Sequence, residues 1–325
     1  MLLDHKQAIL YSGAPENRSH ARREYTLSLD VLIPHYRDLQ GLRQSVESIV
    51  AQTWTGDIRL VVVDDGSPAK EFRRVRALLE QQPLPFVLER NAENRGRPYT
   101  RNRLLDCIDS DFVAWLDADD IWYPEKLEIQ FEHINRLRFA GEDISRIWVT
   151  CNYDWQREGG KCYQVDQVVD CDQLKALFLG QQLRCYLWTL LGPASTFRAV
   201  GRFDEQLPRL QDVDYFIRFV RAGGTLTNTP HQRALCRYNK SDLGRCAHEI
   251  RQCNEILFNK YRASHEQYGR EHLSVVRYNA ETLSARYAKF NHNTLGRAYY
   301  LARAFAANPQ LASGLTRRWV GNFWR

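Results

Sequence analysis

The sequence contains no Cys-x-x-Cys pair, although it has eight cysteines among its 325 residues. This absence removes the main sequence support for a zinc ribbon or a thioredoxin-type redox site. No stretch approaches the ~18 uninterrupted apolar residues that a membrane-spanning helix needs. The first residues, MLLDHKQAIL, lack the basic start and long apolar core of a secretory signal. We therefore expect a cytoplasmic protein without spanning helices, whose thiols are reduced and buried.

The sequence is equally poor in repeats, low-complexity segments and excess charge of one sign. Its 44% hydrophobic and 26% charged residues are ordinary for a globular protein, which excludes the collagen-like and disordered classes. The formal net charge of +6 is mild for this length. It is compatible with anionic partners such as nucleotide diphosphates or membrane headgroups, and we expect no nucleic-acid partner.

Short apolar strands alternate with amphipathic helices in the first half of the chain. The expected strands are 28–34, 58–65, 84–90 and 111–117, and the expected helices are 39–50, 72–79, 98–108 and one that Pro124 opens. Strands that are apolar along their whole length indicate a parallel sheet covered on both faces. The predicted fold class is therefore α/β, with a mostly parallel, Rossmann-like sheet flanked by helices. In such sheets, ligands bind beyond the carboxyl ends of the strands.

We expect three regions along the chain. Residues 1–26 are polar and aperiodic and are predicted to be an irregular N-terminal arm. Residues 27–244 are predicted to be one α/β domain, with further strands near 146–151 and 224–230 and a helix over 213–222. Residues 245–325 carry no strand pattern and are predicted to be a helical extension, in which an Ala-rich helix over 295–307 stops before Pro309.

An acidic motif, LDADD, follows the fourth expected strand and contains Asp117, Asp119 and Asp120. Three carboxylates in four residues repel one another unless a cation lies among them. Mg²⁺ and Mn²⁺ favour such oxygen ligands and are usually bound by one or two carboxylates together with substrate phosphates. The alternative interpretation is an exposed acidic turn that caps the helix opened by Pro124.

Two further motifs follow the second and third expected strands. In VVVDDGS the Asp-Gly pair is typical of a tight turn, and the turn leaves one aspartate facing the crevice to accept hydrogen bonds from a nucleobase. In NRGRPYTRN the arginines Arg95, Arg97 and Arg101 can bind two phosphate oxygens at once through their planar guanidinium groups. The alternatives are a purely structural turn and a solvated basic face.

A fourth motif lies far along the chain, in LQDVDYFIRFVRAGG. Asp212 and Asp214 stand at the start of an amphipathic helix. Both are explained by the favourable interaction of acids with a helix N-terminus. Alternatively, one of them is the base that deprotonates a hydroxyl nucleophile.

Taken in order, the four motifs resemble glycosyltransferase family 2, whose members have the GT-A fold. The likeness runs from about Leu29 to Gly224 and includes a strand ending in Pro-x-Tyr and the segment GRFDEQL before the late Gln-Asp pair. The resemblance implies an inverting, metal-dependent transfer of a sugar from a nucleotide diphosphate, with UDP favoured, to an acceptor hydroxyl. The implied site residues are Pro34, His35, Tyr36, Asp65, Arg95, Arg101, Asp117 and Ala118 for the nucleotide sugar, Asp119 and Asp117 for Mg²⁺ or Mn²⁺, and Asp212 as general base.

The sequence departs from the family pattern at two positions. Gln211 stands where the family usually has Glu, which keeps the base but removes a neighbouring charge. Asn239 stands where a histidine is expected, so that Lys240 or Arg245 is left to neutralise the diphosphate. Two rival functions stay open: a nucleotide-binding module without catalysis, and a nucleotidyltransferase. The nucleotidyltransferase is disfavoured because IPHYRDLQG lacks its Gly-rich loop and lysine.

The C-terminal segment LTRRWVGNFWR alternates arginine with aromatic residues. This composition is typical of an interfacial helix, in which indoles lie at headgroup level and cations attract anionic lipid. It predicts peripheral contact with the inner face of the cytoplasmic membrane and a saccharide or lipid-linked acceptor, as in bacterial surface-polysaccharide synthesis. The alternative is that these aromatics pack the last helix onto the protein.

Overall fold

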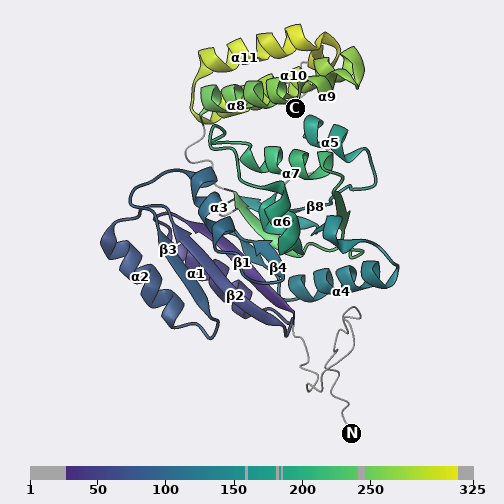
Figure 1. Ribbon diagram of the computed structural model, residues 1–325. Helices are drawn as coiled ribbons and strands as arrows, with labels where there is room; N and C mark the ends of the chain where they lie inside the picture. The colour runs from purple at the N-terminus through teal and green to yellow at the C-terminus, as the bar shows by residue number, and fades with distance from the viewer. Residues whose placement is uncertain (1–26, 158–159, 181–182, 184–185, 241–245, 314–325) are drawn as a thin grey trace.

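The computed structural model describes residues 27–157, 160–180, 183, 186–240 and 246–313. The predicted N-terminal arm, the boundary near residue 244, and the arginine- and tryptophan-rich C-terminal segment lie outside these ranges. Within them the chain builds a central sheet with helices on both faces, a second smaller sheet, and a layer of helices at one end (Figure 1). The predicted α/β class is therefore confirmed.

The central sheet has seven strands in the order β10-β6-β9-β4-β1-β2-β3. All neighbouring strands run parallel except β9, which is antiparallel to β4 and β6. The strands are β1 (Ser28–His35), β2 (Asp57–Asp64), β3 (Phe86–Arg90), β4 (Phe112–Trp115), β6 (Ile147–Thr150), β9 (Leu191–Pro193) and β10 (Thr225–Asn228). The predicted strands of the first half are all present. Their apolar runs are explained by burial on both faces.

Alternate residues of these strands pack into two separate cores, because successive side chains of a strand point to opposite faces. On one face, Val31 and Leu60 pack with α1 (Leu39–Val50), α2 (Ala69–Glu80) and α4 (Lys126–Phe139). On the other face, Leu32 and Val61 pack with a second set of helices. That set comprises α3 (Arg97–Asp106), α5 (Gln173–Leu179), α6 (Ala194–Val200) and α7 (Gln211–Arg221). Two short 3₁₀ turns complete the packing: η1 (Ile144–Arg146) packs on the first core, and η2 (Leu187–Thr189) contributes to both.

A second sheet of four short strands was not predicted. Its order is β5-β11-β7-β8, formed by β5 (Ile121–Trp122), β7 (Tyr153–Arg157), β8 (Cys162–Val165) and β11 (Cys236–Lys240). The pairing of Trp122 with Cys236 joins segments more than a hundred positions apart in the sequence. A pattern search within a short window has no access to such a pairing. The only local signal was the alternation Tyr153-x-Trp155 and Cys236-x-Tyr238.

The chain after the second sheet is helical, as predicted. It forms α8 (Ala247–Lys260), α9 (Arg262–Glu266), α10 (Gly269–Phe290) and α11 (Thr294–Ala307). These helices form a layer against α5 and α7, at the top of Figure 1, with α11 on the outside. No helix in the described part of the chain is long and apolar enough to cross a membrane.

The cysteines only partly match the expectation of buried thiols. Among the described cysteines, Cys151, Cys236 and Cys253 are buried, and Cys107 is half-buried. The expectation is wrong for three that are exposed: Cys162, Cys171 and Cys246. Cys162 belongs to β8, which lies at the edge of the second sheet and faces solvent along most of its length.

A buried histidine pair under the helical layer predicts acid sensitivity. His265 Nδ1 lies 3.2 Å from His272 Nε2, and His265 packs on the ring of Phe178 in α5. Burial lowers the pKa of His265 from 6.5 to about 4. As the pH falls, His265 is protonated in the unfolded chain, near pH 6.5, before it is protonated in the folded protein. The neutral, buried His265 therefore contributes its full stabilisation above about pH 6.5, and this contribution is lost as the pH falls from there toward 4.

We therefore expect the melting temperature to fall between pH 7 and pH 5, and to fall less in His265→Leu. A thermal melt of both proteins across this range measures the difference. Identical dependences of melting temperature on pH in the two proteins would show that the histidine pair does not cause the loss of stability at low pH.

Candidate active site

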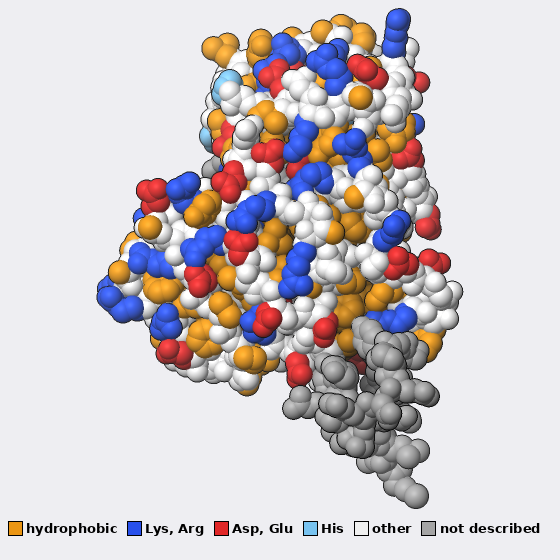
Figure 2. Space-filling view, in the orientation of Figure 1, with side chains coloured by type: hydrophobic (Ala, Val, Ile, Leu, Met, Phe, Trp, Pro, Cys, Tyr) orange, Lys and Arg blue, Asp and Glu red, His pale blue; other side chains and the backbone are white. Residues whose placement is uncertain are grey.

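A cleft of about 1760 Å³ lies at the carboxyl ends of β1, β2 and β4, between the two sheets and the helical layer. Figure 2 shows basic, acidic and apolar side chains interspersed over the face that Figure 1 presents. All of the residues proposed from the sequence line this cleft except Arg95. Those residues are Pro34, His35, Tyr36, Asp65, Arg101, Asp117, Ala118, Asp119 and Asp212. Segments far apart in the sequence thus converge on one site.

The end of β1 presents His35 and Tyr36 to the cleft. His35 is buried, and its Nδ1 lies 2.8 Å from Asp64 Oδ2, while its Nε2 has no hydrogen-bond partner. Tyr36 is 41% exposed, and the guanidinium of Arg37 lies 5.1 Å from the centre of its ring. The Asp64 contact fixes the imidazole, and the loop after β1 leaves the Tyr36 ring accessible to a ligand.

The turn after β2 holds the loop that follows β3. Asp65 accepts hydrogen bonds from the backbone N–H groups of Arg95 (2.8 Å) and Gly96 (2.9 Å) and from the Asn91 side chain (2.8 Å). Gly66 has φ +77°, and a Cβ on it would lie 2.3 Å from the Glu93 carbonyl carbon. Glycine is therefore required here both for its conformation and for the close approach of the two loops.

The arginines of the NRGRPYTRN motif are divided between the cleft and the surface. Arg101 and Arg97 line the cleft, whereas the Arg95 side chain is 51% exposed and stacks 4.7 Å from the centre of the Tyr99 ring. Arg101 is buried; its Nη2 lies 3.1 Å from Asp117 Oδ1, and its Nε and Nη1 have no partner. Of the three candidate arginines, Arg97 lines the cleft although the family resemblance did not imply it as a site residue, and Arg95, which the resemblance did imply, does not.

The acidic loop after β4 is crowded with negative charge. Burial and the neighbouring carboxylates of Asp117 and Asp38 raise the pKa of Asp119 to about 7. Burial also raises the pKa of Asp120, whose Oδ2 has no partner. On the β11 side, Asn239 donates its backbone N–H to Asp120 Oδ1 at 3.1 Å. The loop is therefore held by Asn239 from the position where we expected a histidine; the Lys240 side chain and Arg245 lie outside the described part of the structure.

A divalent cation fits the negative charge and the oxygen atoms of this loop. Among the described residues, no group of three His, Cys, Asp or Glu side chains has metal-ligand geometry. Burial, Asp117 and Asp38 raise the pKa of Asp119, and the positive charge of Arg97 offsets this rise only in part. Mg²⁺ and Mn²⁺ commonly take one or two carboxylates and complete their shell with water and substrate phosphates. Asp119 and Asp117 have the oxygen ligands that such an ion takes.

The two aspartates at the start of α7 point in different directions. Asp212 lines the cleft, and its carboxylate accepts a hydrogen bond from the Val213 N–H at 2.9 Å. Burial raises the pKa of Asp212, and the positive charge of Arg101 limits the rise. The preceding Leu210 has a left-handed backbone with φ 61°. A non-glycine residue in this region is strained, and such strain is often found at functional sites.

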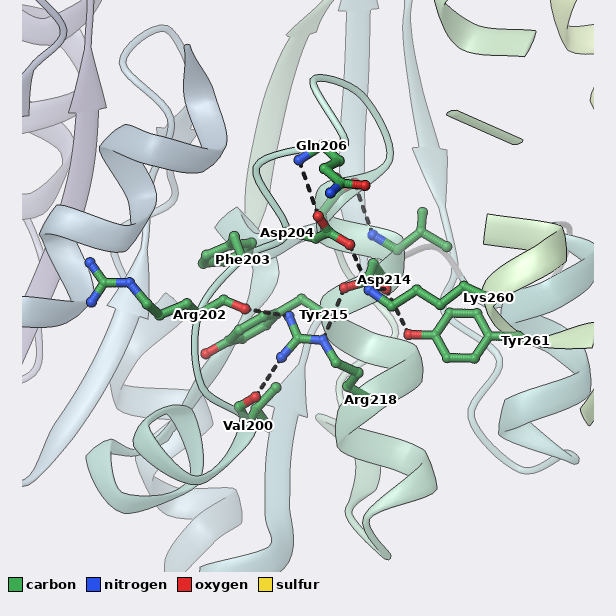
Figure 3. A network of polar contacts seen from close by, with 12 residues as sticks. Val200, Arg202, Phe203, Asp204, Gln206, Asp214, Tyr215, Arg218, Lys260 and Tyr261 are labelled. Atoms are coloured by element: carbon green, nitrogen blue, oxygen red, sulfur yellow. Dashed lines mark hydrogen bonds and ion pairs between the residues drawn. The ribbon is translucent and has the colours of Figure 1, made fainter. Parts of the chain in front are cut away.

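Asp214 instead belongs to the protein interior. It is fully buried and bonds Arg218 Nε at 2.9 Å, Lys260 Nζ at 2.8 Å and the Tyr261 hydroxyl at 2.6 Å (Figure 3). Lys260 also bonds Asp204 of the GRFDEQL segment at 2.8 Å. Asp214 therefore connects α7 to the end of α8, and through Lys260 it connects α7 to the GRFDEQL loop that precedes α7.

We expect Asp214→Asn to lower the free energy of unfolding by about 3 kcal/mol, because breaking a buried ion pair leaves its partners uncompensated. The dissociation constant for the nucleotide should change little, since Asp214 does not line the cleft. A denaturant melt and a nucleotide titration of the variant measure both. A variant as stable as the wild type would show that the Asp214 network contributes nothing.

Residues 30–187 match the family described as Glycosyl transferase family 2. These residues form a glycosyltransferase family 2 domain. An uncharacterized glycosyltransferase of Rickettsia prowazekii is 29% identical over 201 residues, which cover 61% of this chain and 60% of that protein. The succinoglycan biosynthesis protein ExoW of Rhizobium meliloti is 36% identical over 112 residues, covering 34% of each chain. The chain thus spans less than two thirds of the length of these relatives.

Solved structures show that the glycosyltransferase domain has the GT-A fold. The mannosyltransferase PcManGT from Pyrobaculum calidifontis, in complex with GDP-Man and Mn²⁺, superposes with a TM-score of 0.56 at 18% identity, covering 93% of this chain and 81% of that one. S. aureus TarS 1-349, in complex with UDP-GlcNAc, superposes with a TM-score of 0.54 at 14% identity, covering 86% and 91%. Because these superpositions cover 86% and 93% of this chain, the likeness in fold extends beyond residue 187.

Proposed function

We propose that this glycosyltransferase moves a sugar from a nucleoside diphosphate to an acceptor hydroxyl with inversion of the anomeric configuration. The observation that carries the proposal is the convergence on one cleft of an acidic loop (Asp117 and Asp119), a buried arginine with unpaired N–H groups (Arg101), and a half-buried carboxylate (Asp212). A leaving diphosphate needs the first two, and a hydroxyl nucleophile needs the third.

The donor nucleotide is proposed to lie against the ends of β1 and β2. Pro34 and the accessible Tyr36 offer an apolar surface for a base, and Asp65 lies beside them with its loop already ordered. UDP is our favoured carrier, in line with the UDP-GlcNAc complex of TarS, and the GDP-Man complex of PcManGT makes GDP the alternative. Thermal shifts with UDP and GDP, each with Mn²⁺, separate the two. A ligand at 100 times its dissociation constant adds about 2.7 kcal/mol of stability.

The diphosphate is proposed to bind between the acidic loop and α3. The unpaired Nε and Nη1 groups of Arg101 can donate to phosphate oxygens, and Arg97 adds a second positive charge on the same side. A Mg²⁺ or Mn²⁺ ion at Asp119 and Asp117 would offset the negative charge that develops on the leaving group. The contact of Arg101 with Asp117 holds the Asp117 carboxylate toward the proposed diphosphate site.

Asp212 is proposed to take the proton from the acceptor hydroxyl. Its raised pKa brings the carboxylate closer to the pH at which it works, which makes it a stronger base. Attack by that hydroxyl on the anomeric carbon, opposite the diphosphate, forms the new glycosidic bond as the bond from the anomeric carbon to the diphosphate oxygen breaks. The nucleoside diphosphate leaves with the electron pair, and the product has the inverted anomeric configuration. Product analysis by NMR tests the inversion. Release of nucleoside diphosphate rather than pyrophosphate excludes a nucleotidyltransferase, and release of neither indicates a binding module.

Surface-polysaccharide synthesis at a membrane is the proposed setting. ExoW is named for succinoglycan biosynthesis. Exposed apolar side chains occur along α11, where Leu295 is 84%, Tyr299 54% and Phe305 53% exposed. Hydrophobic side chains are also visible at the upper end of the molecule in Figure 2. Apolar residues on an outer helix are suited to the membrane interface. Sedimentation with anionic liposomes, for the full chain and for a chain ending at residue 316, tests whether the C-terminal segment is needed.

A further inference from the structure

One wall of the cleft is aromatic and belongs mainly to the second sheet. The aromatic wall consists of Tyr153, Trp155, Tyr186, Trp188 and Tyr238. Tyr153 and Trp155 lie on β7, Tyr238 lies on β11, and the other two lie at η2. Trp155 and Tyr238 are paired in the parallel β11–β7 ladder, so their side chains lie on the same face of the sheet.

The rings of the aromatic wall are held in fixed orientations. Tyr186, Trp188 and Tyr238 are nearly parallel, with interplanar angles of 12–20° and ring centres 5.2–6.1 Å apart. Tyr153 stands perpendicular to Tyr186 and Trp188, at 88° and 89°. Tyr153 and Trp188 are buried, whereas Trp155, Tyr186 and Tyr238 are half-buried. The buried rings therefore orient the half-buried ones before any ligand binds, which lowers the entropy cost of binding.

Contacts through β5 and β11 place the aromatic wall beside the acidic loop. Asn239, the neighbour of Tyr238, donates its side-chain amide to the Asp119 carbonyl oxygen. Trp122, which follows the loop, donates its indole N–H to the Trp188 carbonyl oxygen at 3.1 Å. The wall thus adjoins the proposed metal ligand and shares the cleft with Asp212.

A half-buried aromatic surface in a polar cleft suits a ligand with an apolar face and a polar rim. A pyranose ring has this form: its face presents C–H groups, which are attracted to the negative face of an aromatic ring, and its hydroxyls lie at the edge. The proposed nucleotide region lies at the ends of β1 and β2, on the central sheet, and leaves the side of the cleft formed by the second sheet for another ligand.

We propose that the aromatic wall is the acceptor subsite and that the acceptor is a saccharide whose ring stacks on Tyr186 and Tyr238. This inference rests on the proposed function, since it assigns the second substrate of the same site. Stacking on this wall would bring the nucleophilic hydroxyl of the saccharide between the acidic loop and Asp212.

The test compares leucine variants, which keep an apolar side chain but lose the aromatic ring, with phenylalanine variants, which keep the aromatic ring. Tyr186→Leu and Tyr238→Leu lose the aromatic face, Tyr186→Phe and Tyr238→Phe retain it, and Phe139→Ala removes a ring that is 91% exposed outside the cleft. Chitotriose, cellotriose and mannotriose are the probes, titrated against tryptophan fluorescence with UDP and Mn²⁺ present. Trp155→Leu is a further variant should a tyrosine variant fail to fold.

We expect at least one trisaccharide to bind the wild type, and to bind the Leu variants roughly tenfold more weakly. The Phe variants and Phe139→Ala should bind it as the wild type does, and the UDP dissociation constant should stay within about twofold in all variants. A change in UDP affinity instead of saccharide affinity, equal saccharide affinity in the Leu variants, or no binding to the wild type would overturn the inference.

The proposed function fails in a different way. Saccharide binding that weakens as expected, without any release of nucleoside diphosphate from a donor, would overturn the transfer reaction and keep the saccharide subsite. Transfer with an unchanged KM for the saccharide in the Leu variants would keep the reaction and overturn the subsite.

Discussion

Asp212→Asn should bind the donor as the wild type does and turn over roughly 10²–10⁴ times more slowly, the usual contribution of a positioned base. Asparagine keeps the shape of the side chain and its place in the cleft but does not take up a proton. The hydroxyl nucleophile is then left to lose its proton to water. Nucleoside diphosphate release at saturating donor and Mn²⁺ measures the rate. Calorimetric titration with UDP measures how tightly the nucleotide part of the donor binds.

Asp214→Asn is the matched control for this experiment, because it makes the same chemical change two residues away. It should lose stability and keep most of its turnover at temperatures where it is folded, since Asp214 bonds Arg218, Lys260 and Tyr261 rather than lining the cleft. If Asp212→Asn kept more than about a tenth of the wild-type rate, the assignment of the base would be wrong.

Asp119→Ala should abolish transfer and remove the stabilisation that UDP gives in the presence of Mn²⁺. The carboxylate is destabilised by burial and by Asp117 and Asp38, so its folded-state pKa of about 7 lies above the ordinary value of 3.8. Without metal, this charge lowers stability progressively as the pH rises from 3.8 to 7. In EDTA at pH 8 the variant should therefore melt at a temperature equal to or above that of the wild type.

A matched surface variant, Asp109→Ala, removes a carboxylate that is 86% exposed and should change neither the activity nor the melting temperature appreciably. Melting curves with EDTA, with Mn²⁺, and with Mn²⁺ and UDP together compare the three proteins. Full transfer activity of the wild type in EDTA would contradict the metal-ligand assignment of Asp119.

The first half of the fold could be predicted because its elements are defined by local patterns. The buried run of β2, for example, is recognisable from consecutive β-branched residues, and α1 from apolar residues at helical spacing. The second sheet was missed because its strands are two to five residues long and pair across the chain, as Trp122 does with Cys236. Such strands are stabilised by distant partners, which no short window contains.

The residues of the candidate site likewise divide into those that local sequence patterns predict and those that only the folded chain reveals. The positions of Asp65 and Asp119 after apolar strands were sufficient to predict that they meet at one edge of the sheet. The arginines were harder, because Arg95, Arg97 and Arg101 are chemically alike and only the path of the loop after β3 decides which enter the cleft. Gly96, at φ +86°, and the hydrogen bonds that the backbone N–H groups of Arg95 and Gly96 donate to Asp65 set that path.

The sequence by itself determined the α/β class, the edge of the sheet where the acids gather, and the presence of two candidate bases on one helix. The family resemblance implied Asp212 as the base, and only the tertiary structure shows which of the two aspartates lines the cleft. Residues two apart on a helix are separated by about 200° around its axis, so Asp212 and Asp214 point in nearly opposite directions. The packing of α8 on α7 placed Lys260 and Tyr261 on Asp214 and left Asp212 facing the cleft.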